Sequence, residues 1–267
     1  MNYSLRIAFI GAGRVAGHLA PALVQAGHQV VAVWSRTLST AQQLADKVAA
    51  TALHGDKPDF AAVQADLYLL AVPDDAVPTV LQASKWPSGA LVAHTSGALP
   101  LGVFAGYPQI KGGVFYPLQT FSPGRALTWD AVPLCLEAAD AAGFAVLEAV
   151  ARSLSQRVLR VPSAARQQLH VAAVFACNFT NHLLGIADAL LAGADLPADI
   201  LAPLVRETID KAQSNPPFAV QTGPAIRRDA STIEAHTQAL ATHPTWQLLY
   251  QQLTASIQQA AETGRQA

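Results

Sequence analysis

Cysteine and charge are both scarce in this sequence. Only two cysteines, Cys135 and Cys177, occur among 267 residues, and neither stands in a CxxC pair or in a Cys/His spacing typical of metal sites. This excludes a disulfide framework and predicts no metal centre. Charged residues make up 13%, the formal net charge is −1, and no basic cluster occurs. Because nucleic-acid binding needs a positive surface for phosphates, we expect no nucleic-acid partner.

Long uninterrupted apolar runs are missing as well. The most apolar stretch, 169–192, is interrupted by polar residues, namely His170, Asn178, Asn181, His182 and Asp188. We therefore expect a helix buried in a protein core rather than a membrane span. The N-terminus enters an apolar run, Leu5–Ile10, without the basic flank and cleavage site of a signal peptide. We expect a cytoplasmic protein with no membrane partner.

Up to Pro162, short apolar runs alternate with helical patterns. The strand-like runs are 5–10, 29–34, 67–72, 90–94, 113–115, 133–137 and 157–161. The helical patterns are 15–26, 39–50, 75–83 and 140–154. Buried apolar strands that alternate with helices predict an α/β fold with a doubly wound parallel sheet.

After Pro162 the pattern becomes helical throughout. We expect helices over 163–193, from Pro197 to the prolines after Asn215, from the capping-box pair Ser231 and Glu234, and from Pro244 onward. The sequence therefore predicts two domains. Residues 1–162 form the sheet domain, and 163–267 form a smaller all-α domain for substrate binding and dimerisation.

A glycine-rich turn follows the first predicted strand. Residues Gly11-Ala12-Gly13-Arg14-Val15-Ala16 form the GxGxxA version of the dinucleotide fingerprint. Gly11 permits a tight turn, Gly13 lets the backbone approach a pyrophosphate, and Ala16 allows close packing of helix on strand. The phosphates would bind helix N–H groups at the positive end of the helix dipole. In this strand–turn–helix context, the motif predicts a dinucleotide-binding Rossmann domain rather than a merely structural turn.

The end of the second predicted strand discriminates between cofactors. An NAD site usually carries Asp or Glu about 20 residues after the glycines, to bind the ribose 2′-hydroxyl. This chain has Ser35, Arg36 and Thr37 there, and the next acidic residue is Asp46. Arg36 can pair with a 2′-phosphate and the two hydroxyls can donate to it, so we predict NADP. The alternative is that Arg36 is only a solvated charge before a helix.

Two further loops follow predicted strands, at the edge where open α/β sheets bind ligands. Val72 and Pro73 begin a loop that would flank the cofactor ribose, or that only caps the next helix. Ser96, after the next strand, offers a hydroxyl to an anionic or carbonyl substrate, whereas His94 is interpreted as a strand-end residue.

These segments resemble a bacterial family that pairs an NADP-type Rossmann domain with a helical domain of unknown function. Matching stretches are 11–16, 34–37, 70–74, 94–98, 115–121, 170–178 and 222–229, which are spread over nearly the whole chain. The family is in turn similar to β-hydroxyacid dehydrogenases, pyrroline-5-carboxylate reductases and deazaflavin-linked NADP oxidoreductases. That similarity implies hydride transfer at C4 of the nicotinamide, with a substrate held between domains, but it implies no particular substrate.

The first long helix after the Rossmann domain supplies the catalytic candidates. β-Hydroxyacid dehydrogenases usually carry Lys and Asn there, one turn apart, and this helix has no lysine. It carries Arg166, His170, Asn178 and Asn181 instead. His170 and Asn178 can face one side but lie about 12 Å apart along the axis. We predict His170 as proton donor or orienting group and Asn178 as a substrate anchor; the alternative is that both are satisfied polar groups in a helix core.

A loop from Thr222 to Asp229 is a further candidate. Arg227 or Arg228 could reach a carboxylate or phosphate across an interface. Alternatively, Asp229 caps the next helix and the arginines are surface charges.

Two functions are consistent with these features. The first is an NADP-dependent oxidoreductase that acts on a small carbonyl, imine or hydroxyacid, with an anionic substrate among the candidates. The second is a nonenzymatic NADP-binding sensor or scaffold, an alternative that the missing lysine leaves open. A homodimer is expected in either case, because the apolar faces of the C-terminal helices need to be covered.

Overall fold

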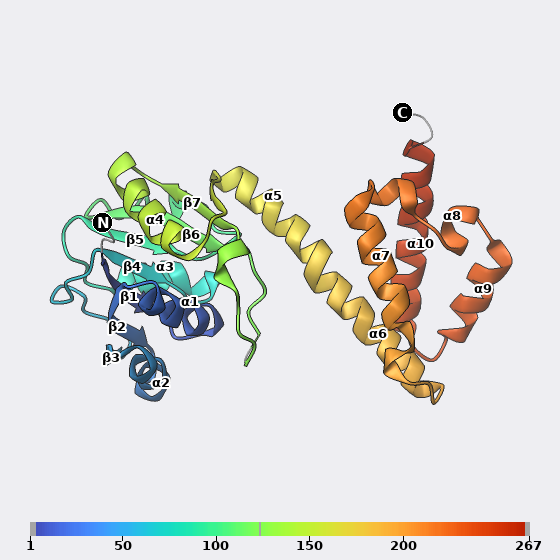
Figure 1. Ribbon diagram of the computed structural model, residues 1–267, viewed down its shortest axis with the longest axis horizontal. Helices are drawn as coiled ribbons and strands as arrows, with labels where there is room; N and C mark the ends of the chain where they lie inside the picture. The colour runs from blue at the N-terminus through green and yellow to red at the C-terminus, as the bar shows by residue number, and fades with distance from the viewer. Residues whose placement is uncertain (1–3, 123, 265–267) are drawn as a thin grey trace. The chain divides into compact units, whose positions relative to one another are not determined.

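The computed structural model describes residues 4–122 and 124–264 (Figure 1). The chain divides into two compact units, Met1–Cys177 and Asn178–Ala267. The boundary predicted near residue 162 marks the end of the last strand, whereas the first unit continues through the following helix to Cys177.

The first unit is built on one eight-stranded sheet. Its strands are β1 (Arg6–Ile10), β2 (Gln29–Ser35), β3 (Thr51–His54), β4 (Leu67–Leu70), β5 (Ala90–His94), β6 (Ile110–Pro117), β7 (Leu134–Ala138) and β8 (Val158–Arg160). The strand order is β3-β2-β1-β4-β5-β6-β7-β8, which reverses direction after β1 as a doubly wound sheet does. This confirms the predicted fold class.

Two details of the sheet differ from the prediction. β3 was not expected, and it is a four-residue edge strand without buried residues. β7 runs antiparallel to β6, so the sheet is not wholly parallel. The reason is the connection between them: parallel strands need a long crossover, usually a helix, and the described part of 118–133 contains only the short 3-10 turn Trp129–Ala131.

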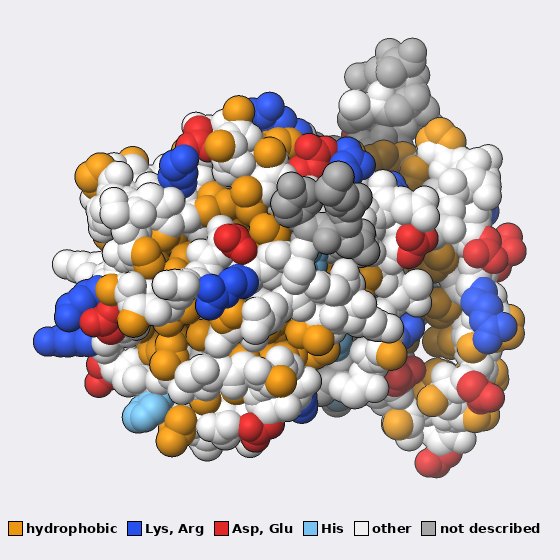
Figure 2. Space-filling view, turned by 60° about the vertical axis from the view of Figure 1, so that its left-hand side comes forward, with side chains coloured by type: hydrophobic (Ala, Val, Ile, Leu, Met, Phe, Trp, Pro, Cys, Tyr) orange, Lys and Arg blue, Asp and Glu red, His pale blue; other side chains and the backbone are white. Residues whose placement is uncertain are grey.

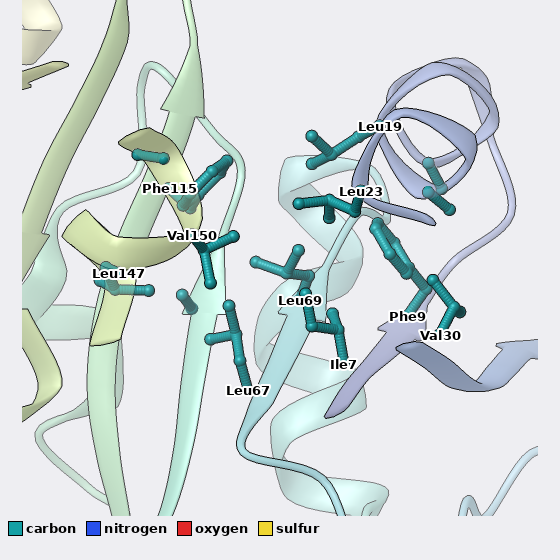
Figure 3. Packing of buried hydrophobic residues seen from close by; sticks show 14 of the residues in the cluster. Ile7, Phe9, Leu19, Leu23, Val30, Leu67, Leu69, Phe115, Leu147 and Val150 are labelled. Atoms are coloured by element: carbon teal, nitrogen blue, oxygen red, sulfur yellow. The ribbon is translucent and has the colours of Figure 1, made fainter. Parts of the chain in front are cut away.

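Helices cover both faces of this sheet. They are α1 (Arg14–Gln25), α2 (Leu38–Val48), α3 (Val77–Ala83) and α4 (Ala141–Leu154). Alternate residues of β1 enter different cores: Ile7 and Phe9 pack in one cluster with α1, α2 and α4, and Ala8 and Ile10 pack in another with α3. Figure 3 shows the first cluster. Because each fully buried aliphatic side chain contributes about 1.5–3 kcal/mol, these two cores hold the carboxyl edge of the sheet in a fixed arrangement.

The remaining elements are helical, as predicted. A continuous helical segment comprises α5 (Ser163–Ala173), the π-helical stretch Val174–Phe179 and α6 (Thr180–Gly193). It is followed by α7 (Ala202–Ser214), α8 (Pro224–Arg227), α9 (Ala230–Ala239) and α10 (Pro244–Gly264). The predicted capping box at Ser231 is wrong. The side chain of Asp229 accepts the N–H of Thr232 and caps α9 instead.

The apolar side chains of the second unit are largely exposed in the single chain. Among residues 178–263, only Ala225 and Leu240 are buried. Exposed large hydrophobic residues include Phe179, Leu183, Leu184, Leu190, Leu196, Ile200, Leu204, Ile209, Phe218, Leu248 and Leu253. Figure 2 shows hydrophobic side chains at the surface of the chain.

The expectation of a buried apolar helix at 169–192 is therefore wrong for one copy of the chain. The helical segment Ser163–Gly193 is, among the described residues, the one long and apolar enough to cross a membrane by length and composition. Its most apolar window has a mean hydropathy of 1.3 and no buried residue. Such a helix is weak evidence for a membrane span, because a helix covered by a protein surface has the same composition.

Candidate functional site

The glycine turn lies between the end of β1 and the start of α1. Gly11 has a φ of 106°, and its N–H donates to the Trp34 carbonyl at 2.7 Å. A Cβ at this position would lie 2.5 Å from the Ala71 carbonyl oxygen, so only glycine fits. Gly13 is the exposed N-cap of α1 and provides no side-chain cap, which leaves the first-turn amides of Arg14 and Val15 open to an anion.

The end of β2 lies next to this turn through the bond between Gly11 and Trp34. Ser35 is the last residue of β2, and Arg36 and Thr37 are exposed beyond it. Arg36 forms no ion pair with any described residue. Thr37 is the N-cap of α2, and its hydroxyl bonds the Thr40 hydroxyl at 2.8 Å. Sequence reasoning missed Thr40, although its position three residues after an N-cap is a recognisable signal.

The loops after β4 and β5 are joined by a hydrogen bond. Ser96 donates its hydroxyl to Asp74 at 2.7 Å, and it accepts the N–H groups of Ala98 and Leu99 at 3.0 Å each. The Ser96 side chain is thus engaged within the chain, and the residue is only 8% exposed. The loop after β4, with Val72 and Pro73, precedes the 3-10 turn that contains Asp74.

His94 is fully buried at the end of β5. Its Nδ1 accepts the N–H of Ser96 at 3.2 Å, and its ring stacks on Phe104 with centroids 5.8 Å apart. Burial, together with the positive charge of Arg166, lowers the pKa of His94 to about 4. The ring is therefore neutral at physiological pH and supports the loop, in agreement with its interpretation as a strand-end residue.

Arg166 is the largest fully buried side chain of the described chain. Its guanidinium donates to Glu137 at 2.6 Å and to the Leu99 carbonyl at 2.5 Å. Ser163 donates to the same Glu137 oxygen at 2.7 Å and accepts the Leu101 N–H at 2.8 Å. Burial disfavours ionisation of Glu137, but the bonds from Arg166 and Ser163 outweigh it and keep the pKa of this carboxyl below its usual value.

His170 lies one turn after Arg166 and contacts the end of β6. Its Nδ1 is 3.1 Å from the hydroxyl of Tyr116, and the two rings meet edge to face with centroids 6.0 Å apart. Both rings pack against Gly97, where an added Cβ would lie 2.6 Å from His170 Nδ1 and 2.8 Å from Tyr116 Cζ. Sequence reasoning did not assign a role to Tyr116, which it noted only as part of the stretch 115–121.

The other predicted residues lie in the second unit. Asn178 is its first residue, is exposed, and forms no hydrogen bond with the described residues. In the 222–229 loop, Asp229 caps α9, which confirms the structural interpretation of that residue. Arg227 lies 4.0 Å from Asp229, and Arg228 pairs with Glu262, so both arginines have partners in the chain.

Comparison with known proteins agrees with this arrangement. The family model of coenzyme F420-dependent NADP oxidoreductases matches residues 6–96, and a model described as a domain of unknown function, DUF2520, matches residues 132–257. No curated protein matches the chain.

Solved structures extend the similarity over the whole chain. A Bacteroides fragilis protein, provisionally described as an NADP oxidoreductase, is 39% identical, with a TM-score of 0.84 over 96% of this chain and 98% of that one. A reductive aminase from Aspergillus terreus, solved with NADPH4, cyclohexanone and allyl amine, is 17% identical, with a TM-score of 0.71 over 98% and 95%. A 1-pyrroline-5-carboxylate reductase from Streptococcus pyogenes is 13% identical, with a TM-score of 0.60 over 96% and 99%.

At these identities, the aminase and the reductase show a shared fold. The Bacteroides protein shows more, because its similarity is higher and covers both chains almost completely. The chain therefore belongs to the family of NAD(P)-dependent oxidoreductases that joins an NADP oxidoreductase domain of the F420-dependent type to a C-terminal DUF2520 domain, as its resemblance predicted.

Proposed function

We propose that this enzyme uses NADP to transfer a hydride to or from a small carbonyl, imine or hydroxyacid. The observation that carries the proposal is that the glycine turn is bonded to the end of the neighbouring strand, where Arg36 forms no ion pair with the described residues. The cofactor, when bound, supplies or accepts the hydride at its nicotinamide. Residues Gly11–Val15 would hold the pyrophosphate, and Val72 and Pro73 would flank the ribose.

The preference for NADP over NAD rests on charge. No acidic side chain follows β2 to bind a ribose 2′-hydroxyl, and one would repel a 2′-phosphate. Arg36 is exposed, and α2 begins just after it with the hydroxyls of Thr37 and Thr40 at its N-terminus. A guanidinium, hydroxyl donors and the positive end of a helix dipole all favour a phosphate dianion.

The test is the affinity of the purified enzyme for NADPH and NADH. We expect NADPH to bind more tightly, and Arg36→Ala to weaken NADPH binding by roughly 10- to 100-fold with little effect on NADH, since one charge-assisted hydrogen-bonding group is lost. Arg157→Ala is the matched control, because Arg157 is exposed beside β8, at the opposite end of the sheet. Equal affinity for both cofactors would overturn the assignment.

His170 is the residue we assign to proton transfer. Imidazole exchanges protons near neutral pH, whereas a guanidinium does not, and Arg166 is in any case bound to Glu137. Ser96 has a supporting role in this proposal, because its hydroxyl holds the loops after β4 and β5 together. Asn178 remains the proposed substrate anchor.

A panel of keto acids, aldehydes and cyclic imines with NADPH, followed by absorbance, tests the activity. We expect His170→Ala to lower turnover by about 100-fold or more while NADPH binding persists, as loss of a general acid does. Cofactor binding without turnover of any substrate class would favour the sensor or scaffold function. Full activity of the variant would show that His170 is structural.

The partner we propose is a second copy of the chain, bound to the 178–267 unit. A domain of this size that folds alone buries well over half of its surface, yet only two of its described residues are buried in one copy. A second copy presents the same apolar helices and can cover them symmetrically. Both cysteines are free, which fits the cytoplasmic location that we also propose.

Sedimentation tests the dimer. We expect the wild type to be dimeric at micromolar concentration and Leu204→Glu, on α7, to dissociate or unfold it, because Leu204 is 63% exposed in one chain. Leu159→Glu on β8 is the control, since this leucine is exposed in the first unit and should tolerate charge. A monomeric wild type would refute the proposal.

A further inference from the structure

We infer that Tyr116 sets the tautomer of His170, so that Nε2 is the nitrogen that exchanges a proton with the substrate. Tyr116 is therefore a positioning residue that acts through His170. The inference rests on the proposed function for its catalytic meaning, but the tautomer itself is a property of the protein without cofactor.

The geometry distinguishes the two ring nitrogens. Nδ1 of His170 faces the Tyr116 hydroxyl at 3.1 Å, whereas Nε2 forms no hydrogen bond with any described residue. The His170 side chain is half-buried, and its Nε2 atom is accessible to solvent. One nitrogen is thus committed to the protein, and the other is available to a ligand.

Gly97 fixes this arrangement. Its missing side chain leaves the space that the two rings occupy, because a Cβ would fall within 2.8 Å of both. Gly97 follows Ser96, whose hydroxyl holds the loop. Arg166 and Gln167 of α5 donate to the carbonyls of Leu99 and Ala98 in the same loop. The helix that carries His170 and the strand that carries Tyr116 therefore meet at a loop held from both sides.

The phenol is suited to this role because it keeps its proton. Burial, with smaller contributions from Cys135 of β7, Asp74 and Cys177, raises the pKa of Tyr116 to about 12, although Arg166 of α5 opposes the rise. The hydroxyl therefore donates to Nδ1 of the neutral imidazole, which places the imidazole proton on Nε2. When the ring is protonated, Nδ1–H donates to the phenol oxygen instead.

When bound, the reduced cofactor would supply a hydride to the carbonyl carbon of the substrate. The protonated ring of His170 would then donate the proton on Nε2 to the carbonyl oxygen, which keeps the electron pair of the broken π bond. The imidazolium of His170 becomes neutral, with its remaining proton on Nδ1 held by the Tyr116 oxygen. Solvent reprotonates Nε2 after the alcohol leaves.

Tyr116→Phe removes the hydroxyl and keeps the ring. Nitrogen-15 NMR of the cofactor-free protein is expected to show Nε2–H as the main neutral tautomer of His170 in the wild type and a mixture in the variant. Tyr107→Phe is the matched control, because no hydrogen bond of the Tyr107 hydroxyl is found among the described residues. An unchanged tautomer in Tyr116→Phe would overturn the inference.

Turnover gives a second readout. We expect turnover to fall roughly 10-fold in Tyr116→Phe, because the variant loses the hydrogen bond that orients the His170 ring. A lower rate with an unchanged tautomer would assign Tyr116 a purely structural role.

Gly97→Ala displaces the two rings without removing a polar group, and it should reproduce both effects. Gly102→Ala is its control, because the space around Gly102 is open. The two proposals fail separately. A wild type that neither binds NADPH nor turns over substrate refutes the proposed function, whereas the NMR comparison still decides whether Tyr116 controls the His170 tautomer.

Discussion

Replacing Arg166 with methionine is expected to destabilise the first unit strongly. The substitution keeps much of the side-chain volume. It leaves Glu137, which is 18% exposed, with the Ser163 hydroxyl but without its cationic partner, and it leaves the Leu99 carbonyl without the Arg166 donor. Removing one partner of a buried ion pair costs about 3–5 kcal/mol, and the partial exposure of Glu137 favours the lower end. For a unit of this size, a loss of about 3 kcal/mol lowers the melting temperature by about 6–12 °C.

Urea unfolding of the wild type and the variant measures this loss. The comparison requires that the free energy of unfolding falls with urea concentration at the same slope in both proteins. Arg152→Met is the matched control. Arg152 pairs with Glu148 on the surface of α4, and such an exposed pair contributes at most about 0.5 kcal/mol. In the wild type, the ion pair of Glu137 should stabilise the folded state at pH values above the unfolded-state pKa of this carboxyl. The stabilisation should be lost as pH falls through the lowered folded-state pKa. A loss below about 1 kcal/mol for Arg166→Met would refute the reasoning.

Three further predictions concern stability, and each is checked by denaturant unfolding. Gly11→Ala should lower the free energy of unfolding by about 3 kcal/mol, because the new Cβ meets both a positive φ and the nearby Ala71 carbonyl. Gly27→Ala is the control: Gly27 also has a positive φ but open space around it, so the loss should be about 1 kcal/mol. Asp229→Ala should cost about 1 kcal/mol as a lost helix cap, and a larger cost for Ser231→Ala would reverse our assignment of the cap. The pKa of His94 is about 6.5 in the unfolded chain and about 4 in the folded protein. Its contribution to the free energy of unfolding is therefore full above pH 6.5 and falls by about 3 kcal/mol towards pH 4. His94→Asn should flatten this part of the stability profile, and an unchanged profile would contradict a buried neutral ring.

The fold was predictable because its signals are local. Each central strand is a short apolar run, and each helix of the first unit shows the matching periodicity, so their alternation was enough to predict a doubly wound sheet. The glycine turn is local too, since Gly11 and Gly13 adjoin the strand and helix that they connect. β3 escaped detection because an edge strand with no buried residue lacks an apolar pattern.

The site was predicted only in part because its contacts join distant residues. His170 stood out as a polar residue in an apolar helix, but its partner Tyr116 is 54 positions away. Glu137, which pairs with Arg166, is 29 positions away. Asn178 was placed by α-helical spacing, whereas it lies in a π-helical stretch whose turns take more residues, so that spacing does not apply.

The first turns of α5 explain why a helix from the all-α part of the sequence contributes to the site of the sheet domain. Ser163, Arg166 and Gln167 each bond the loop after β5, through Leu101, Leu99 and Ala98. Three bonds within two turns fix the direction of the helix at the carboxyl edge of the sheet, and His170 comes one turn later on the same face as Arg166. A helix held by its propensity alone would fray at this end. The buried arginine therefore places the imidazole, and the proposed substrate site depends on residues that the sequence pattern assigns to the next domain.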